Sequence, residues 1–201
     1  MSEKTMRLAV ILGSVRKSRF GPTAASWFTG QAREHGRFEV DVIDLAENPL
    51  PAELPADIHT LGDADGRSDE LVALYERLAA ADAFVVVTPE YNHSFPASIK
   101  HLIDWHYMVW RAKPIGFVSY GGIAGGMRAV EQLRLVFAEL HAVTVRDTVG
   151  FVNYWEKFDS AGSPVEPEAV NGAAKMMLDE LAWWGSVLRN GRAAIPYSPA
   201  A

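Results

Sequence analysis

The sequence contains no cysteine, which excludes disulfide bridges, a thiol nucleophile and zinc sites built on thiolates. It also lacks the run of about 20 apolar residues that a membrane-spanning helix needs, and its short apolar run near the N-terminus has no small-residue cleavage site. Positive charge is scarce, since 19 Lys and Arg stand against 25 Asp and Glu for a net charge of −6. An acidic balance disfavours a broad nucleic-acid-binding surface. We therefore expect a cytoplasmic protein that binds neither membrane nor nucleic acid.

What is present suits one domain spanning residues 1–201, because 49% of these residues are hydrophobic and can form one sizeable core. Apolar runs typical of buried strands alternate with helical patterns, which predicts a parallel sheet with helices on both faces. The expected strands are Arg7–Leu12, Phe38–Ile43, Phe84–Val87, Ile115–Val118 and Ala142–Val145. The expected helices are Pro22–Glu34, one capped by Ser68, one that opens at Pro96 with an apolar stripe reaching Trp110, Met127–Leu140 and Asn171–Leu188.

The longest irregular connection in the first part of the chain runs from Asn48 to about Arg67 and begins with a proline-rich stretch. Loops of this length are uncommon in compact domains and often serve as lids or partner contacts. In open parallel sheets, however, ligands bind at the carboxyl ends of the strands, where the strand order reverses. The loops after the first, third and fourth expected strands end at that edge, so we searched them for binding chemistry.

The loop after the first strand gathers cations and hydroxyl groups and then enters a helix N-terminus, where free backbone N–H groups and the helix dipole favour an anion. Two familiar phosphate motifs fail here: Val15 and Ser18 stand where a dinucleotide fingerprint needs glycine, and a Walker A alignment fails similarly. The loop favours a monophosphate, although a solvated basic turn remains an alternative. Its polar members are Ser14, Arg16, Lys17, Ser18 and Arg19.

The other two loops differ from each other in chemistry. Residues 88–96 (TPEYNHSFP) offer an aromatic ring, an amide, an imidazole and hydroxyls between two prolines, which suits the rim of a flat heteroaromatic ring. A capped helix entrance is the alternative reading of this loop. Residues 119–126 (SYGGIAGG) hold four glycines, which allow a backbone to approach a ligand closely or to take a positive φ.

At these three loops the chain resembles the NADPH-dependent FMN reductase family of flavodoxin-like proteins. The similar segments are LGSVRKS, PEYNHSFPASIKHLIDW and SYGGIAGGMRAVEQLR, and the resemblance covers about residues 7–146. It implies a three-layer α/β sandwich with a five-stranded parallel sheet in the order 2-1-3-4-5. It further implies bound FMN, NADPH as the reductant, and a homodimer or homotetramer. Residues 151–201, an aromatic segment followed by a helix, fall outside the shared pattern.

The resemblance also assigns cofactor contacts by position. Ser14, Arg16 and Ser18 would hold the FMN phosphate, while Ser119, Tyr120, Gly121 and Gly122 would border the flavin ring. Five residues of the middle loop would line the ribityl chain and the ring: Pro89, Glu90, Tyr91, Asn92 and Ser94. The neighbouring Arg19, Phe20 and His93 complete the expected contacts, and Arg16 or Arg19 is also a candidate for the 2′-phosphate of NADPH.

The implied activity is hydride transfer from NADPH through FMN to a quinone, an azo or nitro compound, or free flavin. Because the cofactor carries this chemistry, we name no catalytic acid or base. A flavin reductase that supplies a partner monooxygenase and a non-catalytic electron carrier are the alternatives. No metal is expected, since His101 and His106 are five residues apart and cannot share one helix face. We expect Asn153–Phe158 to be ordered, either over the flavin or at a subunit interface.

Overall fold

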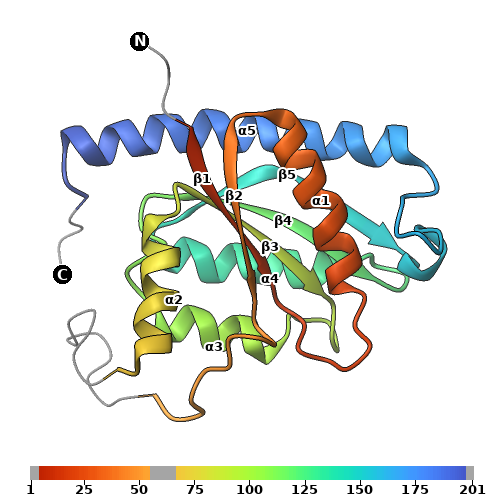
Figure 1. Cartoon of the computed structure of the whole chain (residues 1–201), viewed down its shortest axis with the longest axis horizontal. Coiled ribbons are helices and arrows are strands. Elements are labelled where there is room, and N and C mark those ends of the chain that lie inside the picture. Colours follow the sequence, from red (N-terminus) through yellow and green to blue (C-terminus); the bar gives the residue numbers. More distant parts are fainter. Residues whose placement is uncertain (1–4, 55–66, 198–201) are drawn as a thin grey trace.

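The computed structural model describes residues 5–54 and 67–197, and within them one parallel sheet has the strand order β2-β1-β3-β4-β5 (Figure 1). All four strand pairings are parallel, with Leu8 opposite both Val40 on one side and Ala83 on the other. The predicted five-stranded flavodoxin-like order is confirmed. The strands are β1 (Met6–Leu12), β2 (Phe38–Asp44), β3 (Ala83–Pro89), β4 (Pro114–Gly121) and β5 (Val143–Val152).

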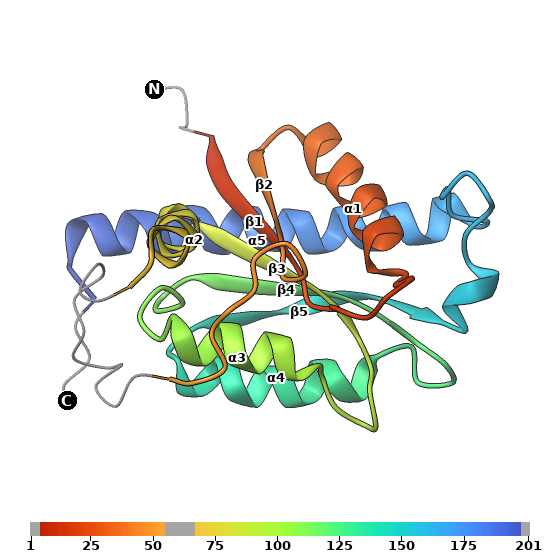
Figure 2. The same ribbon diagram turned by 60° about the horizontal axis from the view of Figure 1, so that its bottom comes forward.

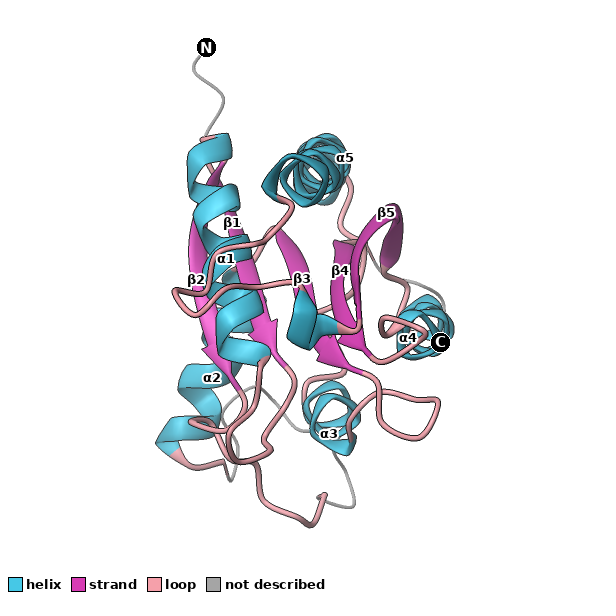
Figure 3. Ribbon diagram, turned by 90° about the vertical axis from the view of Figure 1, so that its right-hand side faces the viewer, coloured by secondary structure: helices cyan, strands magenta, loops and turns pink. Residues whose placement is uncertain are grey.

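Helices cover both faces of the sheet and make it a three-layer sandwich (Figures 2 and 3). One apolar core lies between the sheet and helices α1 and α5, and a second lies between the sheet and helices α2, α3 and α4. The helices are α1 (Gly21–His35), α2 (Asp69–Ala80), α3 (Ala97–Trp105), α4 (Met127–Glu139) and α5 (Pro167–Ala194), with a short 3₁₀ turn η1 (Tyr154–Glu156) after β5. None of the helices in the described part of the chain is long and apolar enough to cross a membrane.

Local sequence explains why these elements begin and lie where they do. Every residue of β3 and β4 is buried, as continuous apolar runs between two helical layers predict. The Ser68 hydroxyl accepts a hydrogen bond from the Leu71 N–H at 3.5 Å, which confirms the predicted cap of α2. Pro22 lies in the first turn of α1, where its missing N–H costs no hydrogen bond.

Three expectations about element bounds were wrong. Helix α3 ends at Trp105, so Trp110 does not extend its stripe but is buried in the following turns against Phe84 and Phe137. Strand β5 is ten residues long and continues to Val152, which pairs with Gly121. An edge strand with polar residues between its apolar ones hides this length, because only alternate side chains are buried. Helix α5 is longer than predicted at both ends.

The long connection predicted from Asn48 to Arg67 is described only at its two ends, because residues 55–66 lie outside the described part. Its suggested role as a lid or a partner contact therefore stays a prediction. The sheet brings the carboxyl ends of β1, β3 and β4 to one edge. The loops that follow these three strands are the ones that the sequence singles out.

Candidate cofactor-binding site

The loop between β1 and α1 presents two cations that the protein itself does not neutralise. The side chains of Arg16 and Lys17 are exposed, and neither forms an ion pair with any residue in the described ranges. The loop ends at Phe20, which gives α1 no side-chain cap, and no acidic residue lies in the first turn of that helix. An uncapped helix N-terminus next to free cations is a favourable place for a phosphate.

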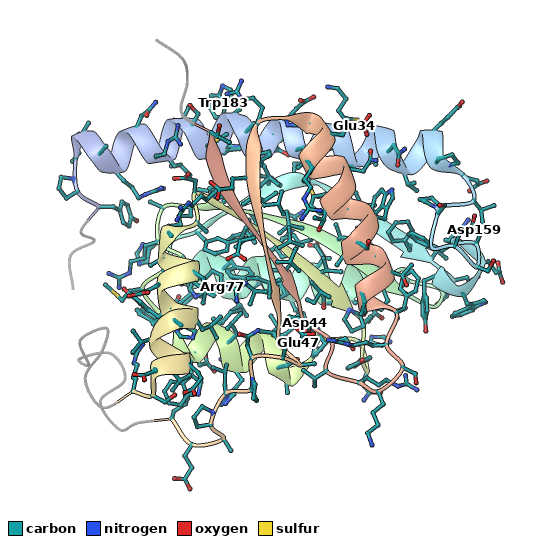
Figure 4. All side chains as sticks on the ribbon, viewed as in Figure 1. Glu34, Asp44, Glu47, Arg77, Asp159 and Trp183 are labelled. Carbon is teal, nitrogen blue, oxygen red and sulfur yellow. The ribbon has the colours of Figure 1, made fainter. Side chains whose placement is uncertain are left out.

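Arg19 differs from these two cations because its guanidinium is already occupied. Its two terminal nitrogens donate to the two carboxylate oxygens of Asp44, each at 2.5 Å, and one also donates to the carbonyl of Ser14 at 2.7 Å. The Asp44 side chain raises the pKa of Arg19 through this pairing. Asp44 lies at the lower end of β2, where the chain from β1 to α1 passes (Figure 4). Arg19 thus braces the loop against β2 and keeps the backbone of Ser14 in place.

The middle loop is a tight hairpin that side-chain hydrogen bonds from α4 hold in place. Tyr91 and Ser94 exchange two backbone hydrogen bonds of 2.8 and 3.0 Å, and Asn92 and His93 between them have φ values of 50° and 68°. Positive φ at both central residues is what a two-residue turn of this kind requires. Gln132 donates to the His93 carbonyl at 2.8 Å and accepts from the Ser94 hydroxyl at 2.5 Å. The hairpin is therefore held in one position by a side chain from α4.

Glu90 makes a second connection between this loop and α4. Its carboxylate accepts from the Arg128 guanidinium at 2.9 Å and from the Arg128 backbone N–H at 3.2 Å. A carboxylate at a helix N-terminus is favoured by the helix dipole, and here it satisfies one of the free backbone donors. Glu90 borders the cleft, but its carboxylate is bound to the first turn of α4.

The glycine-rich loop after β4 is packed too closely for larger residues. Gly126 has a φ of 89°, and a Cβ atom there would lie 2.6 Å from the Cβ of Ser119. Ser119 is fully buried, and its hydroxyl donates to the carbonyl of Gly125 at 2.8 Å. Ser119 therefore holds the shape of the loop from beneath, while Gly121 and Gly122 form its surface toward the cleft.

An aromatic cluster closes the cleft on the side of α1 and α5. The ring centroid of Tyr154, in η1, lies 4.6 Å from that of Phe20 and 5.4 Å from that of Tyr120. Phe158 extends the cluster at 5.1 Å from Phe20. The segment Asn153–Phe158 thus lies beside the candidate site, and the Asn153 N–H donates to the Gly122 carbonyl at 3.2 Å. Its predicted position over the flavin or at a subunit interface stays a prediction.

Together the three loops enclose a cleft of about 280 Å³ at the carboxyl edge of the sheet. Most predicted contact residues line it, whereas Asn92, His93, Ser94 and Ser119 do not. The lining residues are Ser14, Arg16, Lys17, Ser18, Arg19, Phe20, Pro89, Glu90, Tyr91, Tyr120, Gly121, Gly122 and Tyr154. Two of these were missed: Lys17 stands within the predicted phosphate loop, and Tyr154 belongs to the aromatic segment whose position the sequence left open.

The donors in this cleft fit a phosphate-tailed heteroaromatic group. The loop after β1 lines it with the hydroxyls of Ser14 and Ser18 and the exposed cations Arg16 and Lys17. The other two loops line it with the ring of Tyr91, whose hydroxyl is hydrogen-bonded to that of Ser14, and with the backbone of Gly121 and Gly122. The Tyr120 hydroxyl is buried and has no hydrogen-bond partner within the described residues, so the cleft has an unused polar group. These features match FMN, which combines a phosphate monoester with a flat ring system.

The histidines of the described ranges gather at no common site. In the described ranges, no group of three or more potential metal ligands comes together. His101 contacts the carbonyl of Pro51 at 2.6 Å. His106 is buried beneath α2 and α3, and burial, with a smaller effect of Arg67, lowers the pKa of His106 to about 4. It is a neutral core residue and does not reach the cleft.

Known proteins are similar to this chain in sequence and in fold. The family model described as NADPH-dependent FMN reductase matches residues 6–156. An NAD(P)H-dependent FMN reductase of Schizosaccharomyces pombe is 36% identical over 122 residues, which cover 61% of this chain and 61% of that protein. An NADPH:quinone oxidoreductase of Arabidopsis thaliana is 31% identical over 170 residues, covering 80% of this chain and 83% of the relative.

Among solved structures, a flavoenzyme NAD(P)H:(acceptor) oxidoreductase of Paracoccus denitrificans has the same fold, with a TM-score of 0.72 at 24% identity over 91% of this chain and 98% of that one. The family match includes all three loops of the cleft and ends at η1. It confirms the expected class, an oxidoreductase that uses FMN and NAD(P)H. The chain belongs to the NADPH-dependent FMN reductase family.

Proposed function

We propose that this protein transfers a hydride from NADPH through bound FMN to a small acceptor, a quinone, an azo or nitro compound, or free flavin. The observation that carries the proposal is the polarity of the cleft. Arg16 and Lys17, which form no ion pair within the described residues, line it from the loop after β1, and glycine backbone and the Tyr91 ring line it from the other two loops. A cofactor with a phosphate tail fits this lining with its phosphate toward the loop after β1.

In this arrangement each loop has one task. Ser14, Arg16 and Ser18 hold the phosphate, since charge-assisted hydrogen bonds to an anion are the strong ones. Pro89, Glu90 and Tyr91 of the middle loop line the ribityl chain and the ring, and Gly121 and Gly122 border the ring. The turn of Asn92, His93 and Ser94, which does not reach the cleft, holds Tyr91 in place. FMN held by these residues would supply the redox chemistry, hydride transfer between a nicotinamide and the acceptor. The protein binds, orients and excludes water, and no side chain is required as acid or base.

The rim of the cleft supports a flat, apolar acceptor. Ile123 and Trp155 are exposed large apolar side chains, and the indole of Trp155 lies 3.9 Å from the place of a Cβ on Gly122. The Trp155 N–H donates to the Glu156 carboxylate at 3.1 Å, which fixes the orientation of the ring. Exposed apolar groups at the mouth of a polar cleft favour aromatic ligands. The Arabidopsis relative is named for quinones, the first acceptor class to test.

We also propose a homodimer in the cytoplasm. Support for the dimer comes from an apolar groove of about 460 Å³ between α3 and α4, lined by Ile103, Tyr107, Leu135, Val136 and Leu140 among others. Leu135 in this groove is 74% exposed, and together with its apolar neighbours it forms a contiguous patch of the kind that marks protein–protein contacts. The cytoplasm supplies NADPH, and a chain without cysteine gains nothing from an oxidising compartment.

An anaerobic titration tests the proposed function. The purified protein is loaded with FMN, passed through a sizing column, and mixed first with NADPH and then with a quinone, while the flavin absorbance is recorded. We expect FMN to stay with the protein, its absorbance to bleach on adding NADPH and to recover on adding the quinone. Retained flavin that NADPH does not bleach would identify an electron carrier instead. Flavin that leaves the protein after reduction would favour the supply of a partner monooxygenase.

A further inference from the structure

Tyr120, at the end of β4, has a buried hydroxyl group that no residue in the described part of the chain satisfies. The side chain is only 4% exposed, and its oxygen has no hydrogen-bond partner. Buried hydroxyls of tyrosine nearly always have one, because an unpaired buried polar group costs free energy. A phenylalanine could make the same ring contacts with Phe20 and Tyr154. The ring contacts therefore do not account for the hydroxyl.

The hydroxyl lies at the phosphate end of the cleft, although the sequence pattern placed Tyr120 beside the flavin ring. A Cβ on Gly21, the first residue of α1, would lie 3.1 Å from the Tyr120 oxygen and 3.9 Å from the Cβ of Ser14. The oxygen therefore lies where the phosphate loop enters the uncapped N-terminus of α1. Gly21 is also the residue that leaves room for it.

Hydroxyl groups from three strand ends meet at this point. The Ser14 and Tyr91 hydroxyls are hydrogen-bonded at 2.9 Å, and the Ser14 side chain approaches Tyr120 without completing a hydrogen bond of ordinary geometry. Burial, opposed by that approach of Ser14, raises the pKa of Tyr120. The hydroxyl consequently stays protonated at neutral pH and is available as a donor. An acceptor with several lone pairs is what this cluster lacks.

We propose that the Tyr120 hydroxyl donates a hydrogen bond to the phosphate monoester of FMN and belongs to the phosphate site together with Ser14. This inference rests on the proposed function and adds a residue to its cofactor site. Arg19 does not take this place, because Asp44 holds its guanidinium. A phosphate dianion next to Ser14 would satisfy the buried Tyr120 hydroxyl, which has no hydrogen-bond partner among the described residues.

The test compares FMN with riboflavin, which has the same ring and ribityl chain but no phosphate. The dissociation constants of both flavins are measured from the quenching of their fluorescence, for the wild type and for Tyr120→Phe. We expect Tyr120→Phe to bind FMN about 10- to 100-fold more weakly, because it loses a hydrogen bond to a charged group, and to bind riboflavin as the wild type does. The thermal midpoint without flavin should equal or exceed that of the wild type, since an unpaired buried hydroxyl is removed.

Tyr154→Phe is the matched control, because it removes a hydroxyl from the same aromatic cluster, in which the Tyr154 ring packs on both Phe20 and Tyr120. This variant should change the two dissociation constants by the same factor. Equal weakening of FMN and riboflavin by Tyr120→Phe, or no weakening of either, would overturn the inference while leaving FMN binding by the wild type intact. A wild-type protein that binds neither flavin would overturn the proposed function and this inference together.

Discussion

Cations and buried polar groups have different roles at the two ends of the parallel strands, which we call the carboxyl edge and the amino edge of the sheet. At the carboxyl edge, Arg16 and Lys17 have no partner within the described residues, and the Tyr120 hydroxyl is unpaired. At the amino edge, Lys113 is almost fully buried and donates to the carbonyls of Leu78 and Ala79 at 3.3 and 2.8 Å. It satisfies the last turn of α2, where free carbonyls need donors.

Asp82, directly before β3, completes the amino edge. Its carboxylate accepts from the Arg7 backbone N–H at 2.9 Å and lies 3.4 Å from Arg189 and 3.8 Å from Arg192 of α5. Charges at this edge therefore tie α2, α5 and the sheet to one another. Groups with a protein partner stabilise the fold, whereas groups that lack one at the carboxyl edge are available to a ligand. Substitutions at the two edges should separate stability from binding.

Lys113→Ala should have the largest effect and should act on stability alone. It removes the donor to the Ala79 carbonyl, one of two donors to the Leu78 carbonyl, and a buried stem, so we expect the free energy of unfolding to fall by about 2–4 kcal/mol. Urea unfolding measures this change, and Lys113→Met, which keeps the volume, should lose less. Affinity for FMN should not change. An altered FMN affinity in either variant would show that the two edges are coupled.

Arg16→Ala should show the reverse pattern. Loss of a charge-assisted phosphate contact is expected to weaken FMN binding by about 1.5–3 kcal/mol, with little change in the unfolding midpoint of the flavin-free protein. Fluorescence titration measures the affinity, and Arg33→Ala, which removes a positive charge from the other end of α1, is the control. The same FMN affinity in Arg16→Ala as in the wild type would remove Arg16 from the phosphate site.

The amino edge should also give stability a pH dependence. Burial, and to a smaller degree Arg192, lowers the pKa of Lys113 to about 7 in the folded chain, and Asp82 partly opposes this shift. In the unfolded chain the pKa stays near 10.5. Between these values the unfolded chain binds more protons than the native one, so the free energy of unfolding rises with pH, by at most about 1.4 kcal/mol per unit. Urea unfolding at several pH values in this interval measures the slope. Lys113→Met should lack this part of the rise, and parallel profiles for the two proteins would contradict the assignment.

Much of the fold was predictable from sequence because its signals are local. The continuous apolar runs of β1, β3 and β4 follow directly from burial on both faces. The cap at Ser68 and the turn residue Pro22 mark helix starts within a few positions. The full length of β5 was missed because its polar residues interrupt the apolar pattern.

The site was predictable as three loops, and less so as individual contacts. The loops are placed by topology, since strand ends meet at one edge. Which side chains stay free depends on partners distant in sequence: Asp44 occupies Arg19, and Arg128 occupies Glu90. No local pattern contains these pairings. The local sequence also does not reveal the hydrogen bonds by which Gln132 of α4 holds the middle loop.

Removing the contacts between Gln132 and the hairpin should have the smallest effect on FMN affinity. It is also the strictest test of whether contacts at the carboxyl edge serve binding and those at the amino edge serve stability. Gln132→Ala removes both side-chain contacts to the hairpin at His93 and Ser94, each a neutral hydrogen bond at an exposed position. We expect FMN affinity to fall by about 0.5–1.5 kcal/mol, because the loop must then be ordered when the flavin binds. Glu131→Ala, one residue away and paired with Arg134 on its own helix at 3.4 Å, is the control and should bind FMN normally. Stability should hardly change in either variant, since the hairpin contributes little to the core. A loss of stability in Gln132→Ala without a loss of affinity would show that carboxyl-edge contacts, like those of Lys113, serve the fold.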